Sequence, residues 1–235
     1  MCTLTWETFL GGYELHFNRD ESRTRRKADP PKLTVRSGVS VIAPRDSEAG
    51  GTWISLNEAG VSLCLLNNYD AAERIVGHVS RGMLVDALST AKNSSELNTL
   101  ISALNLSDYS AFDLFVFSPK ENPLHISWDG VACKEQKPTE QFASSSGVDT
   151  GEVILGRLQQ YIIRDDQTLT DFHRSHLPSK SAYSVCMHRP DAETQSYTRI
   201  HVNESQCQLW YTDGPPCEAE PSKPLHISRL NTASS

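Results

Sequence analysis

The sequence predicts an α+β domain in which antiparallel strands and helices are segregated into layers. Runs of β-branched and aromatic residues bounded by turn residues predict strands through much of the 235-residue chain. Segments with helical spacing of apolar residues come in pairs between groups of strands, and this order favours a layered α+β fold over a βαβ fold. No G-x-G-x-x-G or Walker motif supports nucleotide binding. We expect a single domain over 1–235, with an irregular tail from about residue 215.

The first half of the chain carries hairpin signals followed by a pair of helices. Gly11-Gly12 separates two strand-like runs, and the segment NEAG separates two more. The prolines and charges of 21–38 predict a loop. Ser94 or Ser95 is a suitable cap for the second helix. The elements expected here are strands at 2–10, 13–19, 51–56 and 61–67, then helices at 81–91 and 94–106.

The second half repeats the order of strands, helices and strands. Asp129-Gly130 is a typical hairpin turn between alternating apolar runs. Helical spacing at 150–164 and 168–176 predicts a second helix pair. The expected strands are 113–118, 124–128, 131–135, 182–188, 194–202 and 207–212, with the short run PLHIS at 224–228 inside the tail.

The composition excludes several classes of function. The formal net charge of −7, from 22 basic and 29 acidic residues, argues against nucleic-acid binding despite the basic run RTRRK at 23–27. Six cysteines without a C-x-x-C pair predict neither a disulfide scaffold nor a zinc ribbon. His173 and His176 show no third ligand, so we expect no metal site. Neither a secretory leader nor a membrane-spanning apolar run is present, so we expect a cytoplasmic protein with free thiols.

The residue after Met1 is a cysteine, which is small enough for the initiator methionine to be removed. Removal would leave Cys2 with a thiol and a free α-amine, whose pKa of about 7.7–8 suits it to serve as the base for the thiol. A nearby arginine would favour the thiolate and depress the pKa of the thiol, and a carboxylate would hold the amine. The run Asn-Arg-Asp-Glu at 18–21 offers both groups.

Two registers of the first hairpin place different members of this run beside the cysteine. With a two-residue Gly-Gly loop, Cys2 faces Glu21, and Arg19 lies diagonally on the same face. With a three-residue loop and a bulge, Asp20 and Asn18 share the Cys2 face instead. The run is also typical of a solvated strand exit, where a carboxylate contributes little to stability. The residues alone leave these alternatives open.

Longer strings add a resemblance to a known family. MCTLTW, NRDE, APRD with GGTW, NEAG and LLNNY follow one another over roughly the first 70 residues, in the order seen in the NRDE family, also called the transport-and-Golgi-organisation family. YSVCMHRPDAETQS and YTDGPPC resemble a bacterial branch of it. The family is in turn similar to N-terminal nucleophile hydrolases of the penicillin V acylase and bile salt hydrolase type. This resemblance implies a four-layer αββα sandwich with mostly antiparallel sheets.

The resemblance also implies a role for each matching residue. Cys2 matches the nucleophile, Asp20 matches the carboxylate that orients it, and Arg19 matches an arginine of the site by residue type. Asn68 in LLNNY matches the oxyanion-hole amide, which would stabilise charge on a reacting carbonyl oxygen. Asn67 is the competing candidate, because strand alternation does not choose between the two.

Other positions match the acylase pattern less closely. Acylases of this group carry a later Thr-Asn pair where this chain has FASSSGV at 142–148, so serines replace the asparagine. Arg189 in CMHRP is the nearest match to their later arginine. We expect Arg189 and His188 to line the mouth of a substrate pocket, and Asn18 to contact substrate as well.

Two functions follow from these expectations. The first is an N-terminal cysteine amidohydrolase or acylase that acts on an amide-like small molecule, at a C–N bond other than a peptide bond, without a cofactor. The alternative is a non-catalytic carrier of haem or another amphipathic ligand, with His188 or Cys2 as an axial ligand. That alternative is implied by the link of eukaryotic family members to haem mobilisation and lipid handling.

Overall fold

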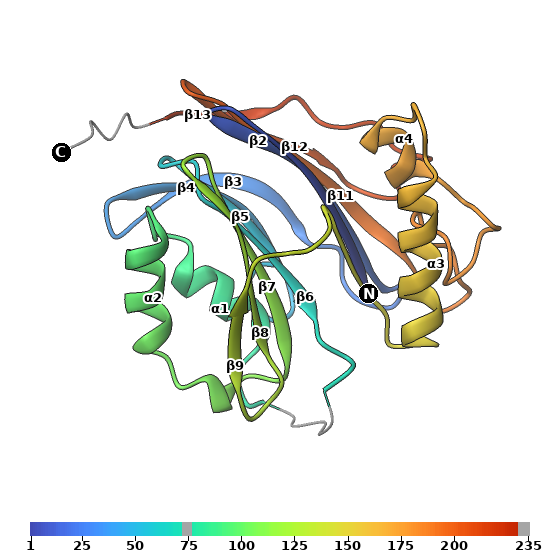
Figure 1. The fold of residues 1–235 in the computed structure, drawn as a ribbon, viewed down its shortest axis with the longest axis horizontal. Helices are drawn as coiled ribbons and strands as arrows, with labels where there is room; N and C mark the ends of the chain where they lie inside the picture. Colours follow the sequence, from blue (N-terminus) through green and yellow to red (C-terminus); the bar gives the residue numbers. More distant parts are fainter. Residues whose placement is uncertain (72–76, 230–235) are drawn as a thin grey trace.

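Helices cover the outer faces of two stacked sheets, so the order of layers is helix, sheet, sheet, helix (Figure 1). The computed structural model describes residues 1–71 and 77–229. This arrangement confirms the αββα sandwich. None of the helices in these two ranges is long and apolar enough to span a membrane. The helices are α1 (Arg81–Leu88) and α2 (Ser94–Ser102) on one side, and α3 (Thr150–Ile162) and α4 (Leu169–Arg174) on the other.

Both sheets are antiparallel. The six-stranded sheet has the order β10-β1-β2-β11-β12-β13, and the seven-stranded sheet has the order β3-β4-β5-β6-β7-β8-β9. The strands of the six-stranded sheet are β1 (Cys2–Phe9), β2 (Gly12–Ser22), β10 (Phe142–Ser145), β11 (Ala192–Val202), β12 (Gln206–Thr212) and β13 (Leu225–Ser228). Those of the seven-stranded sheet are β3 (Asp29–Arg36), β4 (Val39–Arg45), β5 (Ile54–Asn57), β6 (Ser62–Asn67), β7 (Phe112–Ser118), β8 (Glu121–Trp128) and β9 (Cys133–Gln136).

Alternation along each strand divides its side chains between two layers. Leu4 of β1 and Phe17 of β2 point into the core between the sheets, where they meet Phe115 of β7. The alternate residues of β1 and β2 face α3 and α4. Among them, Thr5 Oγ1 lies 2.9 Å from His173 Nε2 of α4. Because both faces of these strands are covered, a polar side chain on either face must find a partner inside the protein.

Two predicted elements differ from the structure. The expected loop at 21–38 contains β3, which is the edge strand of its sheet, with a register shift between Asp29 and Lys32 around the two prolines. An edge strand tolerates proline because one row of its backbone groups needs no partner strand. The expected strand at 182–188 is irregular, and Asn18 Nδ2 donates to its Val185 carbonyl at 2.9 Å.

Smaller corrections concern turns and caps. The first turn is Leu10-Gly11, since Phe9 pairs with Gly12, and the φ of 78° at Gly11 is one that glycine adopts easily. The cap of α2 is Asn93, whose side chain accepts a hydrogen bond from the Glu96 amide, in place of Ser94 or Ser95. The expected hairpin over residues 51–67 forms from β5 and β6.

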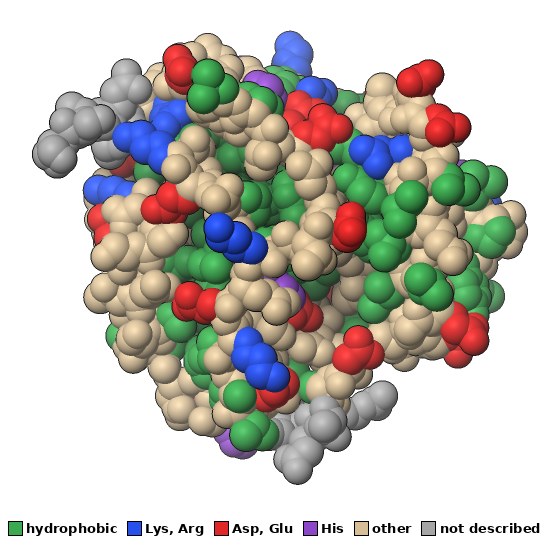
Figure 2. Space-filling model, viewed as in Figure 1, with side chains coloured by type: hydrophobic (Ala, Val, Ile, Leu, Met, Phe, Trp, Pro, Cys, Tyr) green, Lys and Arg blue, Asp and Glu red, His purple; other side chains and the backbone are tan. Residues whose placement is uncertain are grey.

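The outer surface over α3 carries exposed apolar side chains, seen on the right of the space-filling view (Figure 2). The inner face of α3 has an unusual member. Val153, Arg157 and Tyr161 are its buried residues, and Arg157 is fully buried. Arg157 Nη1 lies 3.2 Å from Asp20 Oδ2 and donates to Thr3 Oγ1 at 2.8 Å. An ion pair therefore joins α3 to the six-stranded sheet.

We predict that Arg157→Met destabilises the fold by about 3–5 kcal/mol, because it leaves the buried Asp20 carboxylate without its cation. The matched control is Arg164→Met. Arg164 follows the same helix but is partly exposed and lies 4.0 Å from Glu7, so this change should cost less than about 1 kcal/mol. Urea unfolding of both variants gives the comparison. Equal stabilities for the two would contradict a structural role for the ion pair.

Candidate active site

The register of the first hairpin decides what stands beside the cysteine. Cys2 pairs directly with Arg19, and Met1 continues the ladder opposite Asp20. The pairing is shifted by two residues from the Gly-Gly register, so Cys2 faces Arg19 and not Glu21. A shift of two keeps the faces unchanged. Arg19 therefore shares the Cys2 face, and the bulged register that would bring Asn18 and Asp20 to that face is wrong.

The Asn-Arg-Asp run is buried, so its interpretation as a solvated strand exit is also wrong. Asn18 is fully buried, Asp20 is 2% exposed and Arg19 is 7% exposed. Each side chain has internal partners. Asn18 Nδ2 donates to the His173 carbonyl at 3.0 Å, and Thr194 Oγ1 donates to Asp20 Oδ1 at 2.7 Å. These contacts lie on the face of β2 that is turned toward α3 and α4.

A cavity of about 150 Å³ opens beside Cys2 at the end of the space between the sheets. The guanidinium of Arg19 is fixed there, because its Nη2 donates to Asp46 Oδ2 at 3.0 Å and its carbon lies 4.3 Å from the Trp53 ring centre. The residues that line the cavity are Met1, Cys2, Arg19, Asp20, Glu21, Arg25, Asp46, Gly51, Thr52, Trp53, Leu65, Asn67, Ser80, Arg81 and Gly82.

Burial disfavours the thiolate form of Cys2 while Met1 is present. Burial raises the pKa of Cys2 above its ordinary value, and the negative charges of Asp20 and Glu21 raise it further. The N-terminal amine and Arg19 lower it, but by less. The expected depressed pKa of Cys2 is therefore wrong for this form of the chain, because desolvation of the thiolate outweighs the cations around it.

The amino terminus meets Asp20 through the backbone. The Met1 amine donates to the Asp20 carbonyl at 3.1 Å, and the Asp20 amide donates to the Met1 carbonyl at 2.8 Å. The Asp20 carboxylate lies on the opposite face of the strand from the Cys2 thiol, in contact with Arg157 and Thr194. Burial raises the pKa of this carboxyl, while the charges of Arg157 and of the terminal amine lower it. The amine and the carboxylate are thus electrostatically coupled.

The two asparagines at the end of β6, Asn67 as its last residue and Asn68 just after it, point to different places. Asn67 lines the Cys2 cavity, where its Nδ2 donates to the Tyr69 hydroxyl at 2.8 Å. Asn68 lines a separate cavity and donates to Ser127 Oγ at 3.4 Å. Asn67, and not the expected Asn68, therefore lines the Cys2 cavity. Asn67 follows Leu65, another cavity residue, at the spacing that keeps two strand residues on one face.

The serines of FASSSGV lie beside the nucleophile candidate. Ser145 of β10 pairs directly with Cys2, and Ser144 Oγ donates to the Cys2 carbonyl at 3.0 Å. The Ser145 hydroxyl is buried without a hydrogen-bond partner among the described residues. Directly opposed residues share a face, so an unused hydroxyl group stands on the Cys2 side of the sheet.

Sequence reasoning missed two arginines. Arg157 lies between Val153 and Tyr161 on the buried face of α3. A charged residue at helical spacing between two apolar residues was the sequence signal that could have identified it. Arg81 begins α1 and lines the Cys2 cavity, where its Nη1 donates to the Ala111 carbonyl at 3.0 Å. No carboxylate among the described residues pairs with Arg81, and burial lowers its pKa. Nothing in the sequence marked it out.

Arg189 and His188, which were expected together at the mouth of the pocket, point to different places. Arg189 Nη1 lies 3.9 Å from Met1 Sδ, at the edge of the site, while its other nitrogens bind Asp191. His188 is turned away toward Cys217, at 3.2 Å. Neither lines the Cys2 cavity. His188 also lies near His176 and Cys186, so the premise that His176 lacks further ligands is wrong.

The fold is shared with hydrolases of known structure. Penicillin V acylase from Agrobacterium tumefaciens aligns with a TM-score of 0.58 at 9% identity, over 98% of this chain and 87% of that one. A variant of conjugated bile acid hydrolase from Clostridium perfringens gives 0.56 at 11%, over 100% and 94%. The Caenorhabditis elegans orthologue of N-acylethanolamine-hydrolyzing acid amidase gives 0.52 at 14%, over 85% and 92%.

At these identities the likeness establishes the fold alone. No curated protein sequence is detectably similar to this chain. The family profile described as Transport and Golgi organisation 2 matches residues 1–189. That span includes β1, β2, the Cys2 cavity and both helix layers. The chain therefore belongs to the Transport and Golgi organisation 2 family.

Proposed function

We propose that the protein is an N-terminal cysteine hydrolase that transfers the acyl group of an amide-like small molecule to Cys2 and then to water. The observation that carries this proposal is the pairing of Cys2 with Arg19 at the mouth of a polar cavity, one residue from the amino terminus. Removal of Met1 would turn the Cys2 backbone nitrogen into an amine on the same carbon as the thiol side chain. An amine in that place is a recognised base for such nucleophiles.

The reaction would proceed in two balanced steps. The Cys2 amine takes the thiol proton, and the sulfur attacks the substrate carbonyl to form a tetrahedral oxyanion. Collapse of this intermediate breaks the C–N bond, and the ammonium group returns the proton to the leaving amine, which leaves a thioester on Cys2. Water then attacks the thioester with the amine as base. This second step releases the acid and restores the thiol.

Asp20 and Arg19 would divide the electrostatic work between the two faces of β2. The Asp20 carboxylate is held by Arg157 and Thr194, and its negative charge favours the ammonium form that stores the proton between the steps. Arg19 stands on the thiol face and favours the thiolate. Met1 is part of the cavity wall, so its removal would also enlarge the cavity.

Donors for the oxyanion are available on both sides of the cysteine. The Asn67 amide lines the cavity from β6, and the Ser145 hydroxyl lies across from Cys2 on β10 with no other partner. Preorganised donors of this kind stabilise charge that develops on a carbonyl oxygen. Ser145 would supply a hydrogen bond in the region where acylases carry an asparagine.

We infer from the walls of the Cys2 cavity that the substrate carries an anionic group. Arg81 is a cavity cation without a carboxylate partner among the residues that the structure describes, and it would bind a substrate carboxylate or sulfonate. A second cavity of about 340 Å³ lies along β10, with Leu66, Phe115 and Leu158 among its walls. This second cavity shares no wall residue with the Cys2 cavity, and its apolar walls suit the aliphatic or aromatic part of a small molecule.

We predict that protein lacking Met1 forms a covalent acyl adduct at Cys2 when treated with an activated acyl ester near neutral pH. Cys133 is the internal standard, because it is an exposed thiol on β9. Cys2 should be acylated faster than Cys133 despite its lower exposure, since only Cys2 carries its own base. Intact mass and peptide mapping give the two rates. Protein that retains Met1 should lose the preference, because burial then raises the pKa of Cys2.

The outcome against this proposal is specific. If trimmed protein acylates Cys2 no faster than Cys133, the N-terminal nucleophile mechanism is wrong. Saturable binding of an amphipathic ligand that survives Cys2→Ala would then favour the carrier function, for which the apolar cavity along β10 offers a place.

We also predict that Asn67→Ala slows acylation of Cys2 by about 10²–10³-fold, the usual effect of removing an oxyanion donor. Asn68→Ala is the matched control, because Asn68 lines a different cavity and should change the rate little. Single-turnover acylation of trimmed protein measures both. Thermal melting of each variant separates a lost donor from a damaged fold, since Asn67 also binds Tyr69. A larger effect at Asn68 would restore the order expected from the family pattern.

A further inference from the structure

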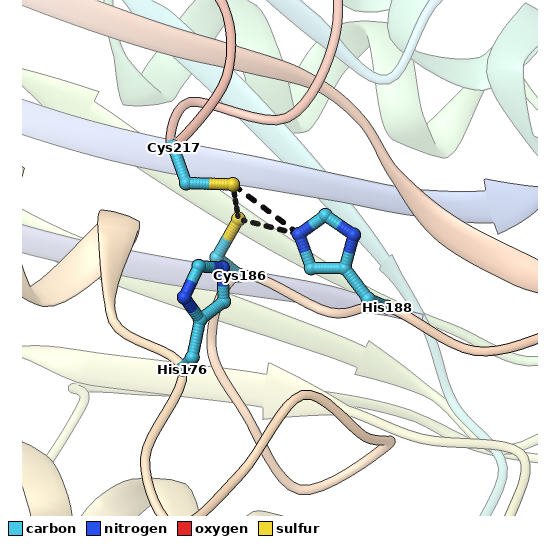
Figure 3. A group of neighbouring side chains, drawn as sticks. All are labelled: His176, Cys186, His188 and Cys217. Carbon is cyan, nitrogen blue, oxygen red and sulfur yellow. Dashed lines mark hydrogen bonds between the residues drawn. The ribbon is translucent and has the colours of Figure 1, made fainter.

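Four metal-ligating side chains converge on the side of the six-stranded sheet away from the Cys2 thiol. They are His176, Cys186, His188 and Cys217, and one ligand atom from each lies within 4.8 Å of all the others. Figure 3 shows the two sulfurs and the two rings turned toward one another. His176 follows α4, Cys186 and His188 lie in the irregular segment before β11, and Cys217 follows β12. All four thiol and imidazole groups stand outside the machinery proposed for Cys2.

The spacing of three of these atoms is close to the edges of a tetrahedron around zinc, and the His176 ligand atom lies within 4.8 Å of each of them. Zinc binds sulfur at about 2.3 Å and nitrogen at about 2.0–2.1 Å, which places neighbouring ligand atoms about 3.3–3.8 Å apart. Cys186 Sγ lies 3.4 Å from Cys217 Sγ and 3.6 Å from His188 Nε2, and Cys217 Sγ lies 3.2 Å from that nitrogen. A disulfide needs about 2.05 Å between sulfurs, and both cysteines are free.

One nitrogen of the cluster lacks a hydrogen bond. His176 Nε2 is buried, and no described residue offers it a partner. A buried polar atom of this kind calls for an explanation such as an ion. Two thiolates and one divalent cation also sum to zero charge, so a metal in this half-buried place would leave no unpaired charge in the protein.

We propose that His176, Cys186, His188 and Cys217 bind one Zn²⁺ ion as a structural site. A set of two sulfurs and two nitrogens favours zinc among the common metals. Four protein ligands close the coordination shell and leave no position for water or substrate, which is the arrangement of structural and not of catalytic zinc. The inference is independent of the function proposed for Cys2.

The ligand-bearing segments are already held together by the protein. The Cys186 amide donates to the Ser175 carbonyl at 2.9 Å, next to His176. Arg174 Nε donates to the Pro216 carbonyl at 2.7 Å, next to Cys217. A metal ion would therefore find its ligands preorganised, and would in return tie the loop after β12 to the segment between α4 and β11.

The zinc site would also support the wall behind Asp20. The amide of Met187, between two of the ligands, donates to Thr194 Oγ1 at 2.8 Å, and that hydroxyl donates to Asp20 Oδ1 at 2.7 Å. Asn18 Nδ2 binds the Val185 carbonyl, which precedes the first cysteine ligand. The metal ligands are thus positioning residues for the Asn-Arg-Asp run. They act on it through the neighbouring residues Val185 and Met187, which are hydrogen-bonded to Asn18 and to Thr194.

The test is a zinc titration of the full-length protein under reducing conditions. Protein stripped of metal is equilibrated with Zn²⁺ against a chromophoric chelator, and bound metal is measured by elemental analysis after desalting. We expect one zinc per chain. Cys186→Ser and Cys217→Ser should each weaken zinc binding by more than the roughly 10–100-fold typical of changes outside the first coordination shell. Cys133→Ser is the matched control, because Cys133 is exposed on β9, and it should bind zinc as the parent does.

A second readout does not depend on the variants folding. Co²⁺ added to the metal-free parent should give the intense visible bands and thiolate charge-transfer absorption of a tetrahedral site with two sulfurs. Absence of stoichiometric zinc in the parent overturns the proposal. So does octahedral Co²⁺ absorption, or a Cys186–Cys217 disulfide found by peptide mapping of the freshly reduced and re-equilibrated protein. Equal loss of zinc from Cys133→Ser and Cys217→Ser would overturn it as well.

Discussion

The buried ion pair between Asp20 and Arg157 is the contact on which the rest of the site depends. It lies where β2 meets α3, and both side chains are fully excluded from water. Removing two charges from water is costly, and the cost is offset only when each charge has several partners. Arg157 also donates to Thr3 and to the Ala182 carbonyl, and Asp20 also accepts from Thr194. These partners fix β1, β2, β11 and the segment after α4 relative to one another.

The consequence for chemistry is a separation of charges across one strand. On the outer face of β2, Asp20 is locked to α3, whereas on the inner face Arg19 is locked to Asp46 and the Trp53 ring. The Cys2 side chain lies on the inner face, and the Cys2 backbone lies beside the Arg19 and Asp20 positions of β2. An alternating strand is well suited to this arrangement, since neighbouring residues of opposite charge act on the same chain end from opposite sides.

Much of the fold could be predicted from local sequence signals. Turn residues and apolar alternation marked the hairpins of β1–β2 and β5–β6, and paired helical segments marked the two outer layers. The exposed edge strand β3 was missed because its prolines and charges are typical of loops. The alternation of residues 182–188 predicts a strand, but their backbone groups bind the Asn18 side chain and the Ser175 carbonyl in place of a neighbouring strand.

The candidate site was predicted in membership better than in geometry. Cys2 and the Asn-Arg-Asp run meet as expected. The register depends on a turn one residue away from the glycine pair, and the burial of Asp20 and the presence of Asn67 in the cavity wall depend on how the layers pack. Arg81, Arg157 and the cluster around Cys217 come from distant segments. No short spacing in the sequence joins them, so only the assembled layers could bring them into view.

The pair of backbone hydrogen bonds between Met1 and Asp20 has a practical meaning for anyone who handles this protein. Because these are backbone contacts, residues other than methionine can make them ahead of the cysteine, with the exception of proline, which has no amide hydrogen. An amino-terminal affinity tag would make the same backbone hydrogen bonds to Asp20, extend β1 and keep the Cys2 nitrogen in a peptide bond. Under the mechanism proposed for Cys2, preparations made in that way would keep the fold and lack the amine base, much as a zymogen lacks its active terminus before its first cut.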